Sequence, residues 1–201
     1  MSANLIFLMS LMTYLTIASL WIIYLGLHSF LASVKVKFWV ENTLKIGPGF
    51  YRLVYSLISI FGIGYLFFQM AITPKIVLFD SPGWLKYVAM ILASWGVIIL
   101  VVSFRYLSGL EFLGLKRAST VGLIRQGIHG YVRHPIYSGT ILVLVGMFLY
   151  NPTDIILVSE VVIFIYLPFG IKWEEQKLIE KYGEAYIQYK REVSAIIPGI
   201  I

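Results

Sequence analysis

The stretch GIHGYVRHPIYSG, residues 127–139, stands at the entrance of an apolar segment and collects polar side chains of several kinds. Two His, one Arg and two Tyr lie within these thirteen residues. Pro135 suits the first turn of a helix, where its missing N–H leaves no bond unmade, so the stretch predicts a helix that begins there. The acidic segment WEEQ, residues 173–176, follows the next apolar run. Together the two segments predict a binding site at the edge of a membrane.

The composition is that of an integral membrane protein. Apolar residues make up 59% of the 201 residues and the mean hydropathy is +0.85, whereas soluble domains have roughly 45–50% apolar residues. The first apolar run has no basic region before it and no small-residue cleavage site, so we expect it to stay as a spanning helix. The absence of cysteine excludes disulfides and thiolate metal sites, and the three dispersed histidines show no metal-ligand spacing.

Five apolar segments predict helices that cross a hydrocarbon core of about 30 Å at about 1.5 Å per residue. They are residues 4–31, 50–72, 84–104, 135–150 and 155–172. The fourth has only sixteen residues, so it and the fifth should form a short hairpin that crosses a thin region or packs inside the bundle. The stretch VKVKFWVENTLKIGPGF, residues 34–50, is polar and broken by Gly47, Pro48 and Gly49, which predicts a loop.

We therefore predict an all-α fold, a polytopic membrane helical bundle of about five spans in a single domain, residues 1–201. Its parts are three N-terminal spans (1–104), a cytoplasmic loop (105–134), a helical hairpin (135–172) and a cytoplasmic tail (173–201). From Glu174 to Val193 the apolar and aromatic residues recur every three or four positions, which predicts an amphipathic tail helix. Gly183 weakens that helix by about 1 kcal/mol relative to Ala, so a break there is expected.

The basic residues indicate an orientation rather than a nucleic-acid surface. If the N-terminus lies outside, all of the sixteen Lys and Arg residues except Lys75 and Lys86 fall on the cytoplasmic side. This asymmetry fits the positive-inside rule with the C-terminus in the cytoplasm, and we expect a multi-pass protein of a prokaryotic cytoplasmic membrane. The same count places residues 127–139 and 173–176 on one side of the membrane.

The chemistry of the two polar segments matches a ligand of mixed charge. Glu174 and Glu175 can accept hydrogen bonds from an ammonium group or from ribose hydroxyls, Arg133 and His134 can hold a carboxylate, and an aromatic face such as that of Tyr137 attracts a cation. S-adenosylmethionine carries all of these groups. The glycine-rich loop after a strand that binds this cofactor in soluble folds is absent, so the site would be built from helix ends and loops.

GYVRHPIYSG followed by WEEQKLIEKYGEAYIQYKREVSAIIP resembles the C-terminal signature of the isoprenylcysteine carboxyl methyltransferase and phospholipid methyltransferase superfamily of integral membrane methyltransferases. The elements are R-H-P-x-Y-x-G, then E-E, then Y-G-x-x-Y-x-x-Y and a terminal I-P, over residues 127–198. The earlier stretches GLHSFLAS and FYRLVYSLIS are similar to the NnrU-type and methanethiol S-methyltransferase branch.

The resemblance implies a methyltransferase that uses S-adenosylmethionine and acts on an apolar or membrane-partitioned acceptor. An isoprenylcysteine carboxylate is the nearest named acceptor, and thiol S-methylation and phospholipid N-methylation are alternatives. A non-enzymatic NnrU-like protein for binding or sensing is the alternative of another class. The positions that match the superfamily's cofactor-binding residues are Gly130, Tyr131, Arg133, His134, Pro135, Tyr137, Gly139, Glu174 and Glu175.

Three further polar residues lie in or beside the predicted spans. His28 near the end of the first span and Arg105 at the end of the third are candidates for catalytic roles on the substrate side. A structural histidine and an arginine that extends to the headgroups are the alternative interpretations. Glu160 lies inside the fifth apolar run, where an ionisable side chain is costly, so either a structural hydrogen bond or a function is expected of it.

Overall fold

The computed structural model describes residues 3–106 and 122–200, and this part of the chain is helical apart from loops and two isolated bridges. The predicted all-α class is confirmed. Half of the predicted 105–134 loop, residues 107–121, lies outside the described residues. The chain divides into two compact units, and α7 (Asp154–Tyr182) passes from the first to the second after Tyr166.

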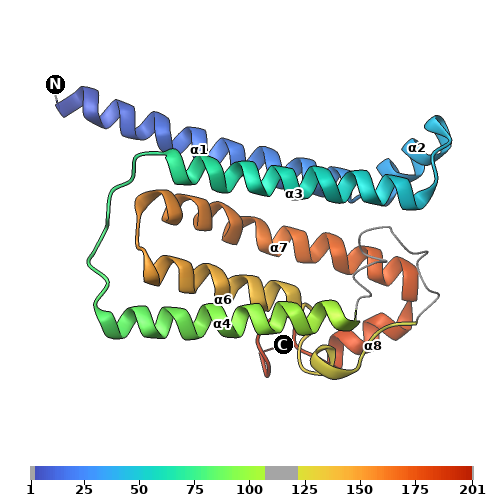
Figure 1. Ribbon diagram of the computed structural model, residues 1–201. Helices are drawn as coiled ribbons and strands as arrows, with labels where there is room; N and C mark the ends of the chain where they lie inside the picture. Colours follow the sequence, from blue (N-terminus) through green and yellow to red (C-terminus); the bar gives the residue numbers. More distant parts are fainter. Residues whose placement is uncertain (1–2, 107–121, 201) are drawn as a thin grey trace. The chain divides into compact units, whose positions relative to one another are not determined.

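The first unit contains α1 (Ala3–Leu31), α3 (Pro48–Ile72) and the beginning of α7. α1 and α3 are adjacent (Figure 1) and are linked by hydrogen bonds, because the Tyr51 hydroxyl donates to the Leu31 carbonyl at 2.7 Å. Farther along, the Tyr24 hydroxyl donates to the Ser59 carbonyl at 3.2 Å. These two bonds show that α1 and α3 run antiparallel.

The connection between these helices corrects a sequence prediction. Residues 34–50 were expected to form a loop, but Val34–Leu44 form a helix, α2. The Ser33 hydroxyl caps it by accepting from Val36 N at 3.3 Å, an N-cap signal that outweighs the polar composition. Lys45 then adopts a left-handed conformation with φ of 53° and ends the helix.

The start of α7 is fixed within the first unit by Asp154. Its carboxylate accepts from the Tyr14 hydroxyl and from Ile76 N, each at 2.8 Å. The negative charge also lies in the first turn of the helix, where the helix dipole favours it. At the other end of this part of α7, the hydroxyls of Tyr166 and Ser29 are hydrogen-bonded.

In the second unit, α4 (Gly83–Tyr106) and α6 (Pro135–Tyr150) pack closely through small residues (Figure 1). A Cβ atom on Gly139 would stand 2.8 Å from the Gly96 carbonyl oxygen, and one on Gly146 would stand 2.7 Å from the Ala89 carbonyl oxygen. Only glycine allows the two backbones to approach this closely, as in other tightly packed membrane helices.

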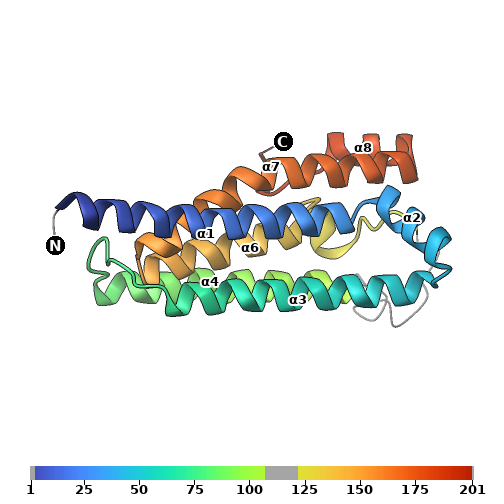
Figure 2. The ribbon, with the colours of Figure 1, turned by 90° about the horizontal axis from the view of Figure 1, so that it is seen from above.

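The predicted break of the tail helix is confirmed, although its start is not. α7 continues without interruption through the WEEQ segment to Tyr182, so no separate tail helix begins at Glu174. Gly183, with φ of 57°, then turns the chain into α8 (Glu184–Glu192). Figures 1 and 2 show that α8 folds back toward the C-terminal part of α7.

Four of the described helices are long and apolar enough to cross a membrane. They are Leu8–Leu31, Pro48–Ile72, Gly83–Arg105 and Asp154–Tyr182. The apolar helix Pro135–Tyr150 is shorter, as the sequence predicted for the fourth segment. The chain is a multi-pass membrane protein.

The contact between α4 and α6 predicts that Gly146→Ala destabilises the protein. The added Cβ would meet backbone atoms of Ala89 and Ala93 at 2.7 and 2.9 Å, and such overpacking costs about 1–3 kcal/mol. Gly64→Ala is the matched control, since nothing lies within 4 Å of its Cβ position and a helical Ala is favoured over Gly. Thermal unfolding in detergent should give a lower Tm for Gly146→Ala alone; equal Tm values for the two variants would contradict the close packing.

Candidate functional site

The turn at Arg133, His134 and Pro135, called the R-H-P turn, is held by residues 194–196 of the second unit. Arg133 N donates to the Ser194 carbonyl at 2.8 Å and His134 N donates to the Ala195 carbonyl at 2.9 Å. The Ser138 hydroxyl extends this pairing to the Ile196 carbonyl at 2.6 Å. Residues 194–196 therefore form a strap that fixes the turn between η1 (Gly127–Gly130) and α6.

The Arg133 guanidinium makes four hydrogen bonds inside the protein. Its Nε and Nη2 atoms donate to Glu175 Oε1 at 3.2 and 3.0 Å. Its Nη1 atom donates to the Lys190 carbonyl at 2.8 Å and also to the Val193 carbonyl. The side chain is 6% exposed. Arg133 thus neutralises a buried carboxylate and satisfies the carbonyl groups at the end of α8, which a helix leaves without partners.

Glu175 is buried and is the point on which three cations converge. Besides Arg133, the Lys190 ammonium donates to its Oε2 atom at 2.5 Å, and His134 Nε2 lies 3.4 Å from its Oε1 atom. A buried carboxylate needs such partners, because desolvation of an unpaired charge costs several kcal/mol. Both of its oxygen atoms are occupied.

His134 faces both acidic residues. Its Nδ1 atom lies 3.6 Å from Glu174 Oε2, and its Nε2 atom faces Glu175. Burial lowers the pKa of His134, but the hydrogen bonds and charges of the two carboxylates outweigh burial and raise it above the usual value. The two carboxylates therefore favour the protonated imidazole, in which both nitrogen atoms can donate. The Tyr137 ring packs edge-on against it at 5.6 Å.

Glu174 and Tyr186 differ from these internally paired groups. The Glu174 side chain is 47% exposed, and His134 is the partner that holds it on one side. Tyr186 is 1% exposed, and its hydroxyl has no hydrogen-bond partner among the described residues. Burial and the charge of Glu175 raise the pKa of Tyr186, so this hydroxyl stays protonated and can donate. The site therefore offers an open carboxylate and an unsatisfied phenol.

Comparison with known proteins places the chain in a family. The sequence model of the family described as NnrU protein matches residues 16–200. The chain belongs to the NnrU protein family. No solved structure gives a significant match.

Named relatives of this NnrU-family protein are methyltransferases, which confirms the predicted resemblance to the membrane methyltransferases. Methanethiol S-methyltransferase 1 of Bradyrhizobium diazoefficiens is 26% identical over 85% of this chain and 62% of the relative. Methanethiol S-methyltransferase of Crocosphaera subtropica is 29% identical over 86% of this chain and 70% of the relative. Protein-S-isoprenylcysteine O-methyltransferase of Schizosaccharomyces pombe is 36% identical over 42% of this chain and 36% of the relative. The chain thus spans less than two thirds of the Bradyrhizobium protein.

The predicted cofactor-binding residues of the NnrU-family protein do not all have the same surroundings. The structure brings Arg133, His134, Glu174 and Glu175 together, but it places Gly139 against α4. Pro135 is the buried first residue of α6, which agrees with its helix-starting role. Tyr137 is half-buried beside His134, Tyr131 is 71% exposed, and Gly130 lies in η1.

The substrate-side candidates lie elsewhere in the chain. His28 belongs to the first unit, where its Nδ1 atom lies 3.0 Å from the Ser59 hydroxyl and its Nε2 atom 3.0 Å from the Tyr55 hydroxyl. Arg105 is an exposed residue in the last turn of α4, in the second unit. Glu160 is buried in the first unit, and its Oε1 atom makes no hydrogen bond with the described residues.

The sequence reasoning did not assign roles to Lys190, to Tyr186 or to the strap 194–196. The Y-G-x-x-Y-x-x-Y signature did point to Tyr186 as part of the resemblance, and the positive φ that Gly183 adopts is what returns this tyrosine toward α7. Lys190 carried no comparable signal, because several lysines of the tail occupy similar surroundings in the sequence.

Arg133→Gln is expected to destabilise the protein by about 3–5 kcal/mol, because it leaves the buried Glu175 carboxylate short of a cation. Arg125→Gln is the control, since Arg125 and Glu192 form an exposed pair that contributes about 0–1 kcal/mol. Chemical unfolding in detergent measures both. Equal losses would show that Arg133 does not have the structural role described.

The pH dependence of stability is expected to follow His134. Because its folded pKa is raised above the unfolded value of about 6.5, its contribution is fully present below that pH and is lost as the pH rises through the folded pKa. Glu174→Gln removes one of the carboxylates that raise this pKa, so the loss should be smaller. Tm measured from about pH 6 to about pH 9 should fall more steeply for the wild type; parallel curves would argue against a protonated His134.

Proposed function

We propose that this NnrU-family protein is a membrane methyltransferase that uses S-adenosylmethionine and acts on a thiol. The observation that carries the proposal is the match to two methanethiol S-methyltransferases over 85% and 86% of the chain. The half-exposed carboxylate of Glu174 beside His134 supports it. The isoprenylcysteine relatives support the same reaction class, but they match 42–45% of the chain.

The chemistry of the site fits the groups of S-adenosylmethionine. An open carboxylate such as Glu174 accepts from an ammonium group or from ribose hydroxyls. The buried Tyr186 hydroxyl, which lacks a partner among the described residues, can donate to a further polar group. Arg133 and Glu175 would not bind the cofactor directly, because their polar atoms are occupied within the protein. They would position Glu174, which neighbours Glu175 on α7.

When bound, S-adenosylmethionine supplies an electrophilic methyl group. The protein would contribute alignment and exclusion of water, and alignment alone can lower a barrier by about 7–11 kcal/mol in favourable cases. Glu174 and Tyr186 would hold the cofactor's polar groups, His134 would orient Glu174, and the strap 194–196 would keep the R-H-P turn in place. His28, in the first unit, and Arg105, in the second, stay predictions for the substrate side.

An isoprenylcysteine carboxylate is the second candidate acceptor. It is favoured by the higher identity of the Schizosaccharomyces pombe relative, 36% over 87 residues. For either acceptor the orientation inferred from Lys and Arg would place the site on the cytoplasmic side of a prokaryotic membrane. A lipophilic or small acceptor would reach it through the membrane.

The proposed cofactor contact predicts that Glu174→Gln weakens binding of S-adenosylmethionine about tenfold or more, the range for a charge-assisted hydrogen bond. Glu180→Gln is the matched control, because it makes the same change at another exposed position on α7. Equilibrium binding of radiolabelled cofactor to the purified protein measures both. Equal affinities for the wild type and Glu174→Gln would remove Glu174 from the proposed site.

The acceptor is tested by methyl transfer from radiolabelled S-adenosylmethionine to methanethiol, a prenylcysteine and phosphatidylethanolamine. We expect transfer to methanethiol above all. Transfer to the prenylcysteine alone would replace the thiol with the second candidate. Absence of saturable cofactor binding would contradict the methyltransferase proposal and favour a non-enzymatic role.

A further inference from the structure

An exposed surface of the first unit, apart from the candidate site, has no part in the proposed reaction. It is formed by α2 and the beginning of α3, and its exposed members are large apolar side chains and lysines. We call it the α2 patch: Val34, Lys35, Phe38, Trp39, Lys45 and Phe50. Phe38 is 68% exposed and Trp39 is 64% exposed.

The architecture of α2 leaves this face open. Val36 and Val40, on another side of the helix, are half-buried, whereas Phe38 and Trp39 are exposed. No residue of α2 is fully buried. A helix of 11 residues that buries so little would gain stability from covering its aromatic side chains.

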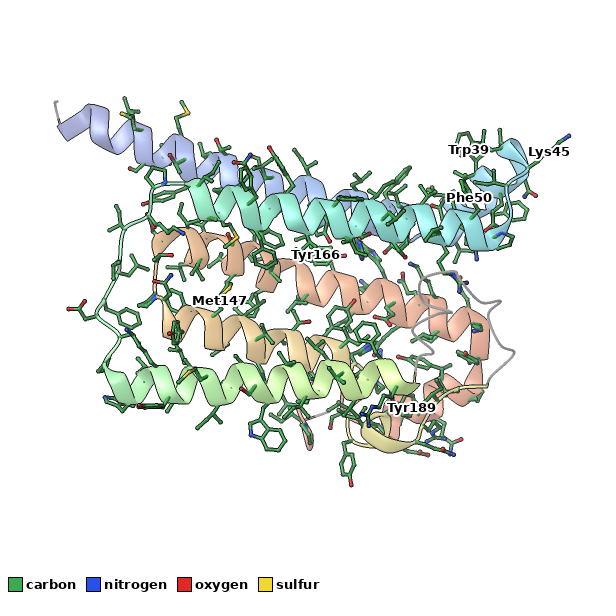
Figure 3. The ribbon with its side chains drawn as sticks, in the orientation of Figure 1. Trp39, Lys45, Phe50, Met147, Tyr166 and Tyr189 are labelled. Carbon is green, nitrogen blue, oxygen red and sulfur yellow. The ribbon has the colours of Figure 1, made fainter. Side chains whose placement is uncertain are left out.

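The end of α2 brings further groups to the same place. Lys45 ends the helix in the left-handed conformation, and Gly47 and Pro48 then start α3, so Phe50 follows within a few residues. Figure 3 shows Trp39, Lys45 and Phe50 at the same end of the unit, where α2 meets α3. Aromatic rings and an ammonium group are thus presented together.

The charge of the patch is positive. Lys35 and Lys45 are exposed, whereas Lys37 pairs with Glu41 at 3.8 Å. Glu41 is the single acidic residue between positions 32 and 52. Tryptophan and phenylalanine next to lysine are the side chains that favour the boundary between headgroups and acyl chains. Each basic residue near an anionic leaflet is attracted to it, and this attraction decays over about one Debye length from the membrane surface.

We infer that the α2 patch binds the surface of the bilayer and selects acidic phospholipids there. Phe38, Trp39 and Phe50 enter the headgroup boundary, and Lys35 and Lys45 bind the phosphates of acidic lipids. This inference does not depend on the proposed methyltransferase activity, because it concerns the lipid around the protein.

The chain contains no cysteine, so a single introduced cysteine can be labelled without background. Phe38→Cys carrying a fluorophore reports the patch, and the full-length protein is placed in phosphatidylcholine vesicles. Nitroxide-labelled phosphatidylglycerol or nitroxide-labelled phosphatidylcholine is then added as quencher. Phe61→Cys is the matched control, because Phe61 is 73% exposed in the middle of α3, within a membrane span.

At position 38 the acidic quencher should act severalfold more effectively than the neutral one, and at position 61 the two should act alike. Lys35→Gln with Lys45→Asn should remove this severalfold preference, because the two lysines supply the attraction to the acidic lipid. Asparagine suits position 45 because it tolerates the left-handed conformation. Equal quenching by both lipids at position 38 would overturn the inference. Protection from both lipids, as expected if a protein covered α2, would also overturn it.

Discussion

The buried ion pair between Arg133 and Glu175 is the interaction on which the second unit depends. It joins the turn before α6 to the C-terminal part of α7, and through the carbonyls of Lys190 and Val193 it also holds the end of α8. In a region of low dielectric each charge requires the other, because separation would leave one of them desolvated and unpaired. The R-H-P turn is thereby fixed before any ligand binds.

This constraint divides the polar residues of the candidate site into two groups. Arg133 and Glu175 have their polar atoms occupied within the protein, and the backbone strap 194–196 supports them. Glu174 and Tyr186 keep bonding capacity that the described residues do not use. His134 connects the groups because it faces both carboxylates. Precise ligand positioning requires contact residues that are supported by others, as Arg133 and Glu175 support Glu174 here.

Local rules were enough to predict much of the fold. The helix start at Pro135 and the turn at Gly183 follow from the backbone preferences of these residues, and the long apolar runs gave the spans. α2 was missed because Gly47 and Pro48 dominated the interpretation of that stretch, although the capping residue Ser33 was present. The extension of α7 past Glu174 was missed because the change from apolar to polar residues was taken for an end of the helix.

The roles within the site were harder to predict, because they depend on contacts between distant positions. Arg133 binds Glu175, 42 residues later, and the carbonyl of Val193, 60 residues later. Neither spacing follows from a periodic pattern. Gly139 illustrates the same limit, since it belongs to the motif in sequence and yet its missing side chain makes room for the backbone of α4.

We propose that S-adenosylmethionine binds beside the R-H-P turn and the acidic pair of α7. Ultraviolet cross-linking of the radiolabelled cofactor to the purified protein, followed by mapping of the labelled peptides, tests it most directly. We expect label in peptides that contain residues 127–139 or 173–193, and loss of this label in the presence of excess unlabelled cofactor. Competable label confined to other parts of the chain, or no competable label at all, would contradict it.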